Sequence, residues 1–148
     1  MKKILVANRA EIALRVMRSA KEMGIKTVAI YSEVDRLSPH VKYADEAVCV
    51  GPPASSDSYL VGEKIIQICK DLGVNGIHPG YGFLSENAAF ARAVADAGIT
   101  LIGPSPDAME VMGDKLAAKA AVKNFEVPMV PGTDEAITDI PAAKKLAD

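Results

Sequence analysis

The chain has 148 residues, with 17 basic and 19 acidic side chains and a formal charge of -2, so its charge balance does not favour a nucleic acid or a membrane surface as partner. Hydrophobic residues make up 49% and charged residues 24%, a composition typical of a globular domain and unlike that of a disordered chain. A chain of this length buries roughly 68 to 70% of the surface that its unfolded form exposes, so a real hydrophobic core is expected.

Cysteines and apolar runs exclude several further classes. Cys49 and Cys69 are separated from each other and from any CxxC pattern, so neither a zinc site nor a disulfide framework is indicated, and both are expected to be reduced core thiols. No apolar run approaches the ~20 residues that span a bilayer. The opening Met1-Lys2-Lys3 leads directly into an apolar run, which predicts no signal segment and a cytoplasmic location.

Short apolar runs rich in valine and isoleucine alternate with segments of helical spacing. The runs are residues 4–7, 27–31, 47–50, 76–78 and 100–102. The helical segments between them lie at residues 12–20, 61–72 and 90–97. This alternation predicts an α/β fold, a Rossmann-like doubly wound parallel sheet of about five strands.

Glycines mark the ends of these helical segments. Gly24, Gly73 and Gly98 each stand between a helical segment and a strand, in "EMGIKTV", "DLGVNGI" and "DAGITLI", which predicts left-handed C-caps. Glu126 takes this place in a fourth copy, "NFEVPMV", where the left-handed conformation costs roughly 1 to 2 kcal/mol.

Helix starts are predicted at Ser58, at Ser85-Glu86 and at Ser105-Pro106. A further helix is expected over residues 114–125, followed by breaks at Pro128, Pro131 and Gly132 and by a helical segment from about residue 139. The predicted domains are therefore residues 1–125 and, at 126–148, a linker with the incomplete start of a second region. We expect the chain to be the front piece of a longer polypeptide.

The carboxyl end of the first strand, "ILVANRAEIALR", lacks the glycines that a dinucleotide site requires. NAD is therefore disfavoured, and Asp35 near the end of the second strand is interpreted as a turn residue. Asn8 and Arg9 have several open interpretations. They could hydrogen-bond across the crevice at the sheet edge or orient a neighbouring domain, or Arg9 could be exposed to solvent or paired with a nearby acid such as Glu11.

The fourth strand ends in "HPGYGFLSEN". Gly80 and Gly82 permit positive φ on both sides of Tyr81, so the turn can present its amides and the ring at the edge of the sheet where ligands bind. A helix opened by Ser85 and Glu86 would favour an anion nearby. The alternative is an ordinary turn with a buried tyrosine. His78 and His40 are interpreted as structural, because neither is paired in sequence with an acid or a nucleophile.

The remaining candidates are a lysine at the start of one predicted helix and a face of the first helix. Lys115, in "VMGDKLAAKAA", follows the capping residue Asp114 and would lie near the carboxyl end of the fifth strand, from where it could reach a phosphate or a nucleotide base. Leu14, Arg18 and Glu22 recur one helical turn apart on the first helix, which is typical of a solvated face or of a symmetric contact between two copies.

Taken together, "ILVANRAEIALRV", "KTVAIYSEVDR", "HVKYADEAV", "HPGYGFLSEN", "LIGPSPDAMEVMGDK" and "VPMVPG" resemble the N-terminal part of biotin carboxylase, in order from residue 3 to about residue 134. The resemblance implies a Rossmann-like pre-ATP-grasp domain, truncated before the ATP-grasp lid. In this family the lid and C-terminal domains carry the phosphate loop, the magnesium-binding glutamates and the arginine beside biotin. No catalytic or metal-binding residue is therefore expected in this chain.

The resemblance also implies an activity and its partners. The complete enzyme would be an ATP-dependent ligase that uses ATP with Mg2+ to activate bicarbonate and carboxylate biotin on a biotin carboxyl carrier protein, in service of a carboxyltransferase component. Lys115 matches the family lysine that contacts ATP, and Tyr81 and Gly82 match the turn at the biotin and bicarbonate end. Arg18 and Glu22 match positions in the contact of a homodimer. The fragment by itself is expected to be inactive.

The sequence departs from the family pattern at Ala10 and Glu126, where glycine is usual; Ala10 is interpreted as an early helical residue. Three alternatives remain open at this point: the front domain of another ATP-grasp ligase, a free-standing binding or dimerisation module, and a nucleotide-binding regulator. The Rossmann-like slab is expected to carry Tyr81 and Lys115 along one rim, as half of a cleft completed by protein beyond this chain.

Overall fold

The computed structural model describes residues 1–125, 127–130 and 137–147, so the predictions for Glu126, Pro131 and Gly132 lie outside the described residues. The chain forms two compact units, Met1–Pro106 and Asp107–Asp148, and each is described by itself. The predicted domain boundary at residue 125 stays a prediction.

The first unit is built on one sheet of five parallel strands. They are β1 (Lys3–Val6), β2 (Lys26–Ser32), β3 (Glu46–Gly51), β4 (Gly76–His78) and β5 (Thr100–Leu101). Their order across the sheet is β3-β2-β1-β4-β5, the doubly wound arrangement that the alternating pattern predicts. In register, Val6 of β1 lies opposite Ala29 of β2 on one side and His78 of β4 on the other.

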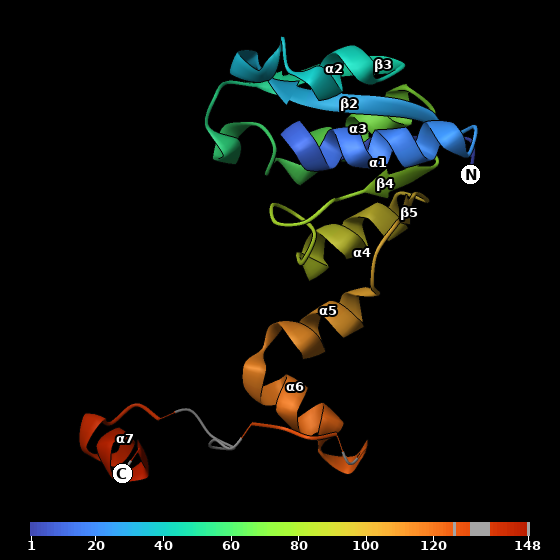
Figure 1. Cartoon of the computed structure of the whole chain (residues 1–148). Helices are drawn as coiled ribbons and strands as arrows, with labels where there is room; N and C mark the ends of the chain where they lie inside the picture. The colour runs from blue at the N-terminus through green and yellow to red at the C-terminus, as the bar shows by residue number, and fades with distance from the viewer. Residues whose placement is uncertain (126, 131–136, 148) are drawn as a thin grey trace. The chain divides into compact units, whose positions relative to one another are not determined.

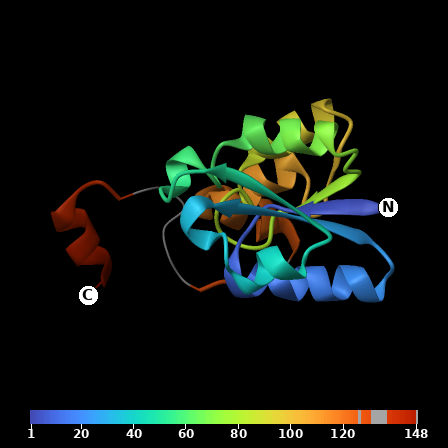
Figure 2. The same ribbon diagram turned by 90° about the horizontal axis from the view of Figure 1, so that it is seen from above.

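Four helices cover the two faces of this sheet. They are α1 (Ala10–Glu22), α2 (Pro39–Tyr43), α3 (Gly62–Asp71) and α4 (Ala88–Asp96). Figure 2 shows α1 and α2 on one face and α3 and α4 on the other. The short α2 was not predicted from the sequence, because five residues are too few to display a helical period.

Two layers of apolar side chains fill the space between the sheet and its helices. Successive side chains of a strand point to opposite faces, so Ile4 and Val6 of β1 pack toward α1 while Leu5 packs toward α3 and α4. Small residues on α1, including Ala13 and Ala20, allow that helix to approach the sheet closely.

The predicted helix C-caps are confirmed. Gly24, Gly73 and Gly98 have φ values of 71°, 63° and 73°. After α1, the amide of Ile25 donates to Ala20 O at 2.8 Å and that of Gly24 donates to Lys21 O at 3.0 Å, the paired bonds of a Schellman motif. Each helix of this kind therefore ends where the glycine turns the chain back toward the sheet.

Two of the three predicted helix starts are wrong. α4 begins at Ala88, capped by Asn87, whose Oδ1 accepts from Phe90 N at 2.9 Å, and Ser85 lies in the preceding turn. α3 begins at Gly62 without a side-chain cap, and the Ser58 hydroxyl instead donates to Ala54 O at 2.7 Å. Serine forms local backbone bonds in turns as readily as at helix ends, which explains the misplacement at Ser58.

The second unit contains helices α5 (Pro106–Gly113), α6 (Lys115–Val122) and α7 (Ile140–Ala147), with a short 3-10 turn η3 (Lys123–Phe125) after α6 (Figure 1). The predicted start of α5 at Ser105-Pro106 is confirmed. Asp114 caps α6, its Oδ1 accepting from Ala117 N at 2.7 Å. Among the residues that the structure describes, every helix is too short or too polar to cross a bilayer.

Candidate functional site

The strand order reverses between β1 and β4, because β2 and β3 lie on one side of β1 and β4 and β5 on the other. In doubly wound sheets, ligands bind beyond the carboxyl ends of the strands at such a reversal. Two segments meet there: Asn8, just after β1, and the turn of residues 79–83, just after β4. We call residues 79–83 the Tyr81 turn.

Asn8 joins these two segments. Its Nδ2 donates to Pro79 O and to Tyr81 O, each at 2.8 Å, and its Oδ1 accepts from Arg9 N at 2.9 Å. The side chain is buried, with 4% of its surface exposed. Hydrogen bonding across the crevice, one of the interpretations open for Asn8 and Arg9, is therefore confirmed for Asn8.

The Tyr81 turn has the backbone that its sequence predicts. Gly80 and Gly82 have φ values of 67° and 65°, on either side of Tyr81. The alternative of a buried tyrosine is wrong, because 63% of the Tyr81 side chain is exposed. Its hydroxyl donates to Glu11 Oε2 at 3.3 Å, which links the turn to the first turn of α1.

A second contact supports the far end of the turn. Phe83 has a φ of 45°, a left-handed conformation that is costly for a side chain of this size. Its ring stacks on that of Tyr59, with centroids 5.2 Å apart and planes 5° from parallel. The packing of two aromatic rings offsets the strained backbone.

Tyr59 and Arg9 connect the turn to the end of β2 through Asp35. Asp35 Oδ2 accepts from the hydroxyl of Tyr59 at 2.6 Å and from Ser32 Oγ at 3.1 Å, and Arg9 Nη1 lies 3.3 Å away. Asp35 lies in the 3-10 turn η1 (Glu33–Asp35), as the turn interpretation expects. The exposure of Arg9 and its pairing with an acid are confirmed, but the acid is Asp35 of η1 and not Glu11.

The pKa values of Asp35 and Tyr59 are shifted in opposite directions. Burial raises the pKa of Asp35, but hydrogen bonds from Tyr59 and Ser32 and the charge of Arg9 outweigh it, so the pKa lies below its ordinary value of 3.8. Burial and the hydrogen bond to Asp35 raise the pKa of Tyr59 to about 12. At neutral pH the pair is therefore a carboxylate with a neutral phenol.

Both histidines are structural, as expected. His78 Nδ1 accepts from Gly80 N at 3.0 Å, and burial lowers its pKa, so the neutral ring helps to close the turn. His40 is fully buried on α2, with Nε2 3.3 Å from Ile30 O, and burial lowers its pKa as well. Of the two cysteines, Cys69 is a core thiol as predicted, whereas Cys49 is exposed.

Ala10 lies at the mouth of the site, with a φ of 53°. It is the first residue of α1, but its backbone is left-handed, so its interpretation as an ordinary early helical residue is wrong. The chain turns sharply here between β1 and α1, because Asn8 must reach across to β4 while Glu11 enters the helix. Such a φ favours glycine, the residue usual in the family that the sequence resembles.

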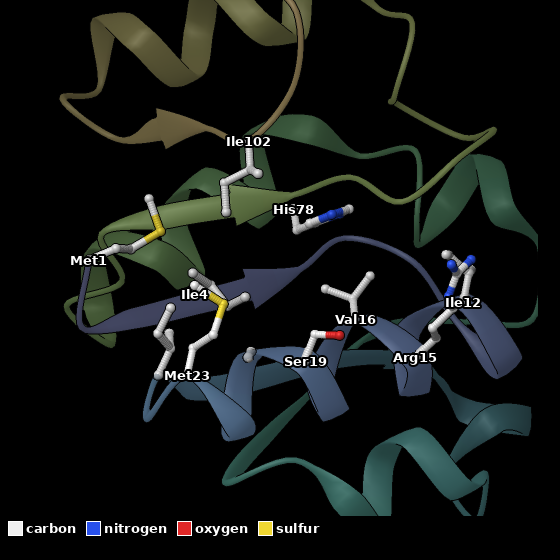
Figure 3. A pocket seen from close by; sticks show the side chains of 11 residues that line it. Met1, Ile4, Ile12, Arg15, Val16, Ser19, Met23, His78 and Ile102 are labelled. Carbon is white, nitrogen blue, oxygen red and sulfur yellow. The ribbon is translucent and has the colours of Figure 1, made fainter.

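Two of the cavities on the first unit bear on a candidate site. The smaller, about 430 Å³, is lined by Asn8, Arg9, Ala10, Glu11, Ile12, Tyr81, Gly82 and Phe83. The larger, about 580 Å³, lies between α1, β1, β4 and the end of β5 (Figure 3) and is mainly apolar, with Met1, Ile4, Val16, Met23 and Ile102 in its walls. The smaller cavity lies at the strand-order reversal and presents charged and backbone polar groups, so it is the candidate site.

The remaining sequence candidates lie away from this turn along the chain. Lys115 is exposed at the first residue of α6, in the second unit. Arg18 and Glu22 are exposed on α1, and Leu14 is half-buried. Whether Tyr81 and Lys115 share one rim stays a prediction. The described residues contain no group of three or more histidine, cysteine or acidic side chains that could hold a metal ion.

Comparison with known proteins gives one consistent result. The family described as "Biotin carboxylase, N-terminal domain" matches residues 1–109. The biotin carboxylase of Halalkalibacterium halodurans is 53% identical over 146 residues, 99% of this chain and 32% of that protein. The mitochondrial propionyl-CoA carboxylase alpha chain of Homo sapiens is 52% identical over 145 residues, 98% of this chain and 20% of that protein.

A solved structure agrees over the same length. The biotin carboxylase domain dimer of Hydrogenobacter thermophilus 2-oxoglutarate carboxylase, in complex with MgADP, ADP and bicarbonate, superposes with a TM-score of 0.91 at 50% identity, covering 99% of this chain and 32% of that one.

An all-parallel sheet with a glycine-bounded polar turn at its strand-order reversal defines a Rossmann-like α/β ligand-binding domain. Within this class the family match covers most of the chain, and relatives at about 50% identity cover nearly all of it. The chain belongs to the biotin carboxylase N-terminal domain family. It spans about a third of the length of the biotin carboxylases that it matches.

Sequence reasoning missed three features of the site: the partners of Asn8 in the Tyr81 turn, Glu11 as the partner of Tyr81, and the hydrogen bond between Tyr59 and Asp35. Asn8 carried a signal, since a polar residue directly after a buried strand must find partners. Tyr59 carried none, because its position depends on the long connection between β3 and α3.

Proposed function

We propose that this chain is the N-terminal domain of a longer biotin carboxylase, a ligase that uses ATP, Mg2+ and bicarbonate to carboxylate biotin on a carrier protein. The observation that carries the proposal is the match along the whole chain to biotin carboxylases that are about three times as long. The complex of the Hydrogenobacter thermophilus relative with MgADP and bicarbonate supports the choice of ligands.

In this proposal the Tyr81 turn forms part of the wall at the biotin and bicarbonate end of the site. Gly82 carries no side chain, and the position of a Cβ there meets no atom within 4 Å, so its backbone is open to a ligand. Lys115, at the first residue of α6, supplies a positive charge to ATP phosphates. Mg2+ is held by groups outside this chain.

The carboxyl acceptor is set by a different component. Relatives with nearly equal identity to this chain are named for different acceptors: propionyl-CoA at 52%, pyruvate at 49% and 2-oxoglutarate at 50%. Because no one of these acceptors goes with a higher identity to this chain, we infer that the domain does not select the acceptor. We therefore propose a biotin carboxyl carrier protein and a carboxyltransferase component as partners, and a cytoplasmic location. Fatty acid biosynthesis is one pathway that such a carboxylase serves.

The proposal is tested by comparing the full-length carboxylase with the 148-residue chain in an assay of bicarbonate-dependent ADP release with free biotin. We expect activity in the full-length protein and none above background in the chain. Lys115→Ala in the full-length protein should raise the KM for ATP at least tenfold, whereas Lys119→Ala, one turn further along α6, should change it less than twofold. Bicarbonate-dependent ADP release by the chain alone would contradict the proposal.

A further inference from the structure

We propose that Asn8 is the positioning residue of the Tyr81 turn, and that its amide group, from the end of β1, fixes where Tyr81 and Gly82 meet the biotin and bicarbonate end of the site. The last clause rests on the proposed function. The mechanical link between Asn8 and the turn rests on geometry within the first unit alone.

One amide group holds the turn at two points. The carbonyls of Pro79 and Tyr81 lie on either side of Gly80, and both accept from Asn8 Nδ2 at 2.8 Å. An amide nitrogen has two hydrogens, so both are used. Because Asn8 is almost fully buried, water has little access to replace these bonds if the amide is removed.

The two glycines of the turn differ in their surroundings. A Cβ on Gly80 would lie 2.7 Å from Asn8 Nδ2 and 3.0 Å from its Cγ, too close for a side chain. A Cβ on Gly82 would meet nothing within 4 Å. Gly80 is therefore required for contact with Asn8, whereas Gly82 provides the backbone conformation and the open surface.

Asn8 is itself held firmly. Its Oδ1 accepts from Arg9 N, and Arg9 pairs with Asp35 at the end of β2. Ala7 N donates to His78 O at 2.9 Å, so β1 and β4 remain paired up to the residue before Asn8. The position of the turn is thus tied to β1 and β4, and a binding group supported in this way can be held to a fraction of an ångström.

The mechanical link is tested by hydrogen exchange in the 148-residue chain carrying Asn8→Asp. This change keeps the shape and the acceptor of Asn8 but places a carboxylate oxygen against two carbonyl oxygens. We expect the exchange rates of two amides to rise at least tenfold: Gly80 N, which donates to His78 Nδ1, and Ser85 N, which donates to Gly82 O. Amides in β2 should change less than twofold.

Asn75→Asp is a matched control. Asn75 lies at the opposite end of the same pair of strands and uses only its Oδ1, which accepts from Lys2 N and Lys3 N at 3.3 Å. Aspartate retains that acceptor, so this variant should leave the turn unchanged. If Asn8→Asp also leaves the exchange rates of the turn unchanged, the inference is overturned.

The effect of Asn8 on the biotin and bicarbonate end is tested in the full-length carboxylase by measuring kcat and KM separately for biotin, bicarbonate and ATP. Asn8→Asp and Gly80→Ala should each lower kcat/KM for biotin or raise the KM for bicarbonate at least tenfold, with the KM for ATP changed less than twofold. Asn8→Asp alters one partner of the contact and Gly80→Ala the other, so both variants should change the constants for biotin or bicarbonate and leave the KM for ATP unchanged. A general loss of folded enzyme lowers kcat and leaves every KM unchanged.

Tyr81→Ala distinguishes a failure of the positioning role of Asn8 from a failure of the assignment of the turn to the biotin and bicarbonate end. If Tyr81→Ala weakens the use of biotin or bicarbonate and Asn8→Asp does not, the positioning role is overturned while the proposed function stands. If neither variant changes these constants, the assignment of the turn to that end of the site is wrong, and the inference is overturned with it.

Discussion

Ala10 combines an ordinary side chain with a backbone that favours glycine. Its φ of 53° costs an L-residue roughly 1 to 2 kcal/mol. The strain persists because the residues on both sides are fixed: Asn8 by its bonds to the Tyr81 turn and Glu11 by the start of α1. The conformation at residue 10 is thus a consequence of the site, and the alanine is tolerated there.

Replacing Ala10 by glycine should stabilise the chain. Relief of the strain exceeds the roughly 0.4 to 1 kcal/mol that the more flexible unfolded chain costs, so the free energy of unfolding should rise by about 0.5 to 1 kcal/mol. Urea denaturation measures this. Ala93→Gly, at an exposed position inside α4, is the matched control and should lower the free energy of unfolding by about 1 kcal/mol. Equal losses from both variants would contradict the argument.

The connection between β3 and α3 stabilises the candidate site through Tyr59. Its hydroxyl donates to Asp35 and accepts from Ser32 N at 2.9 Å, while its ring supports Phe83. Tyr59→Phe keeps the ring and removes both bonds, and should lower the free energy of unfolding at pH 7 by about 2 kcal/mol.

The effect of Tyr59→Phe should depend on pH. Asp35 has a lowered pKa in the folded chain, so its contribution is complete above the unfolded pKa near 3.9 and is lost as the pH falls through the folded value. Tyr59 has a raised pKa, so its contribution is complete below about pH 10 and is lost as the pH rises toward 12. The difference between wild type and variant should therefore be largest between these limits.

Urea unfolding of both proteins from pH 3 to pH 7 checks the acid side. Tyr43→Phe serves as control, because Lys21 Nζ contacts the ring of Tyr43, 4.4 Å from its centroid, and its backbone oxygen, and neither contact uses the hydroxyl. Its effect should stay below about 0.5 kcal/mol at every pH. A Tyr59→Phe difference that does not shrink at pH 3 would show that Asp35 is not its main partner.

At this scale the sequence predicts the elements well and the site only in part. The five strands and the ends of α1, α3 and α4 follow from short apolar runs and from glycine C-caps, signals that lie within a few residues of the element. The link from Asn8 to Tyr81 spans 73 residues and exists only because β1 and β4 are neighbours in the sheet. Local patterns do not contain that order, so the partner of Asn8 could not be read from them.

The chain contains one layered α/β unit and one helical unit. The exposed side of α1, in the first unit, is a candidate surface for contact between two copies of the protein. Ala13, Met17 and Ala20 bury the inner side of this helix, while Arg18 and Glu22 are exposed on the outer side. In the family that the chain belongs to, the Hydrogenobacter thermophilus relative has been solved as a dimer. We propose that Arg18 and Glu22 take part in a two-fold contact of the full-length carboxylase.

Charge reversal tests this contact, because in a two-fold interface each residue appears twice. Arg18→Glu should weaken the dimer at least tenfold, and the exchanged pair Arg18→Glu with Glu22→Arg should restore it if the two residues meet across the interface. Lys70→Glu, an equivalent reversal at an exposed position of α3, should leave the mass measured by light scattering unchanged. A 148-residue chain that dimerises by itself through the same residues would favour the free-standing dimerisation module, and a dimer unaffected by Arg18→Glu would place the contact on another surface.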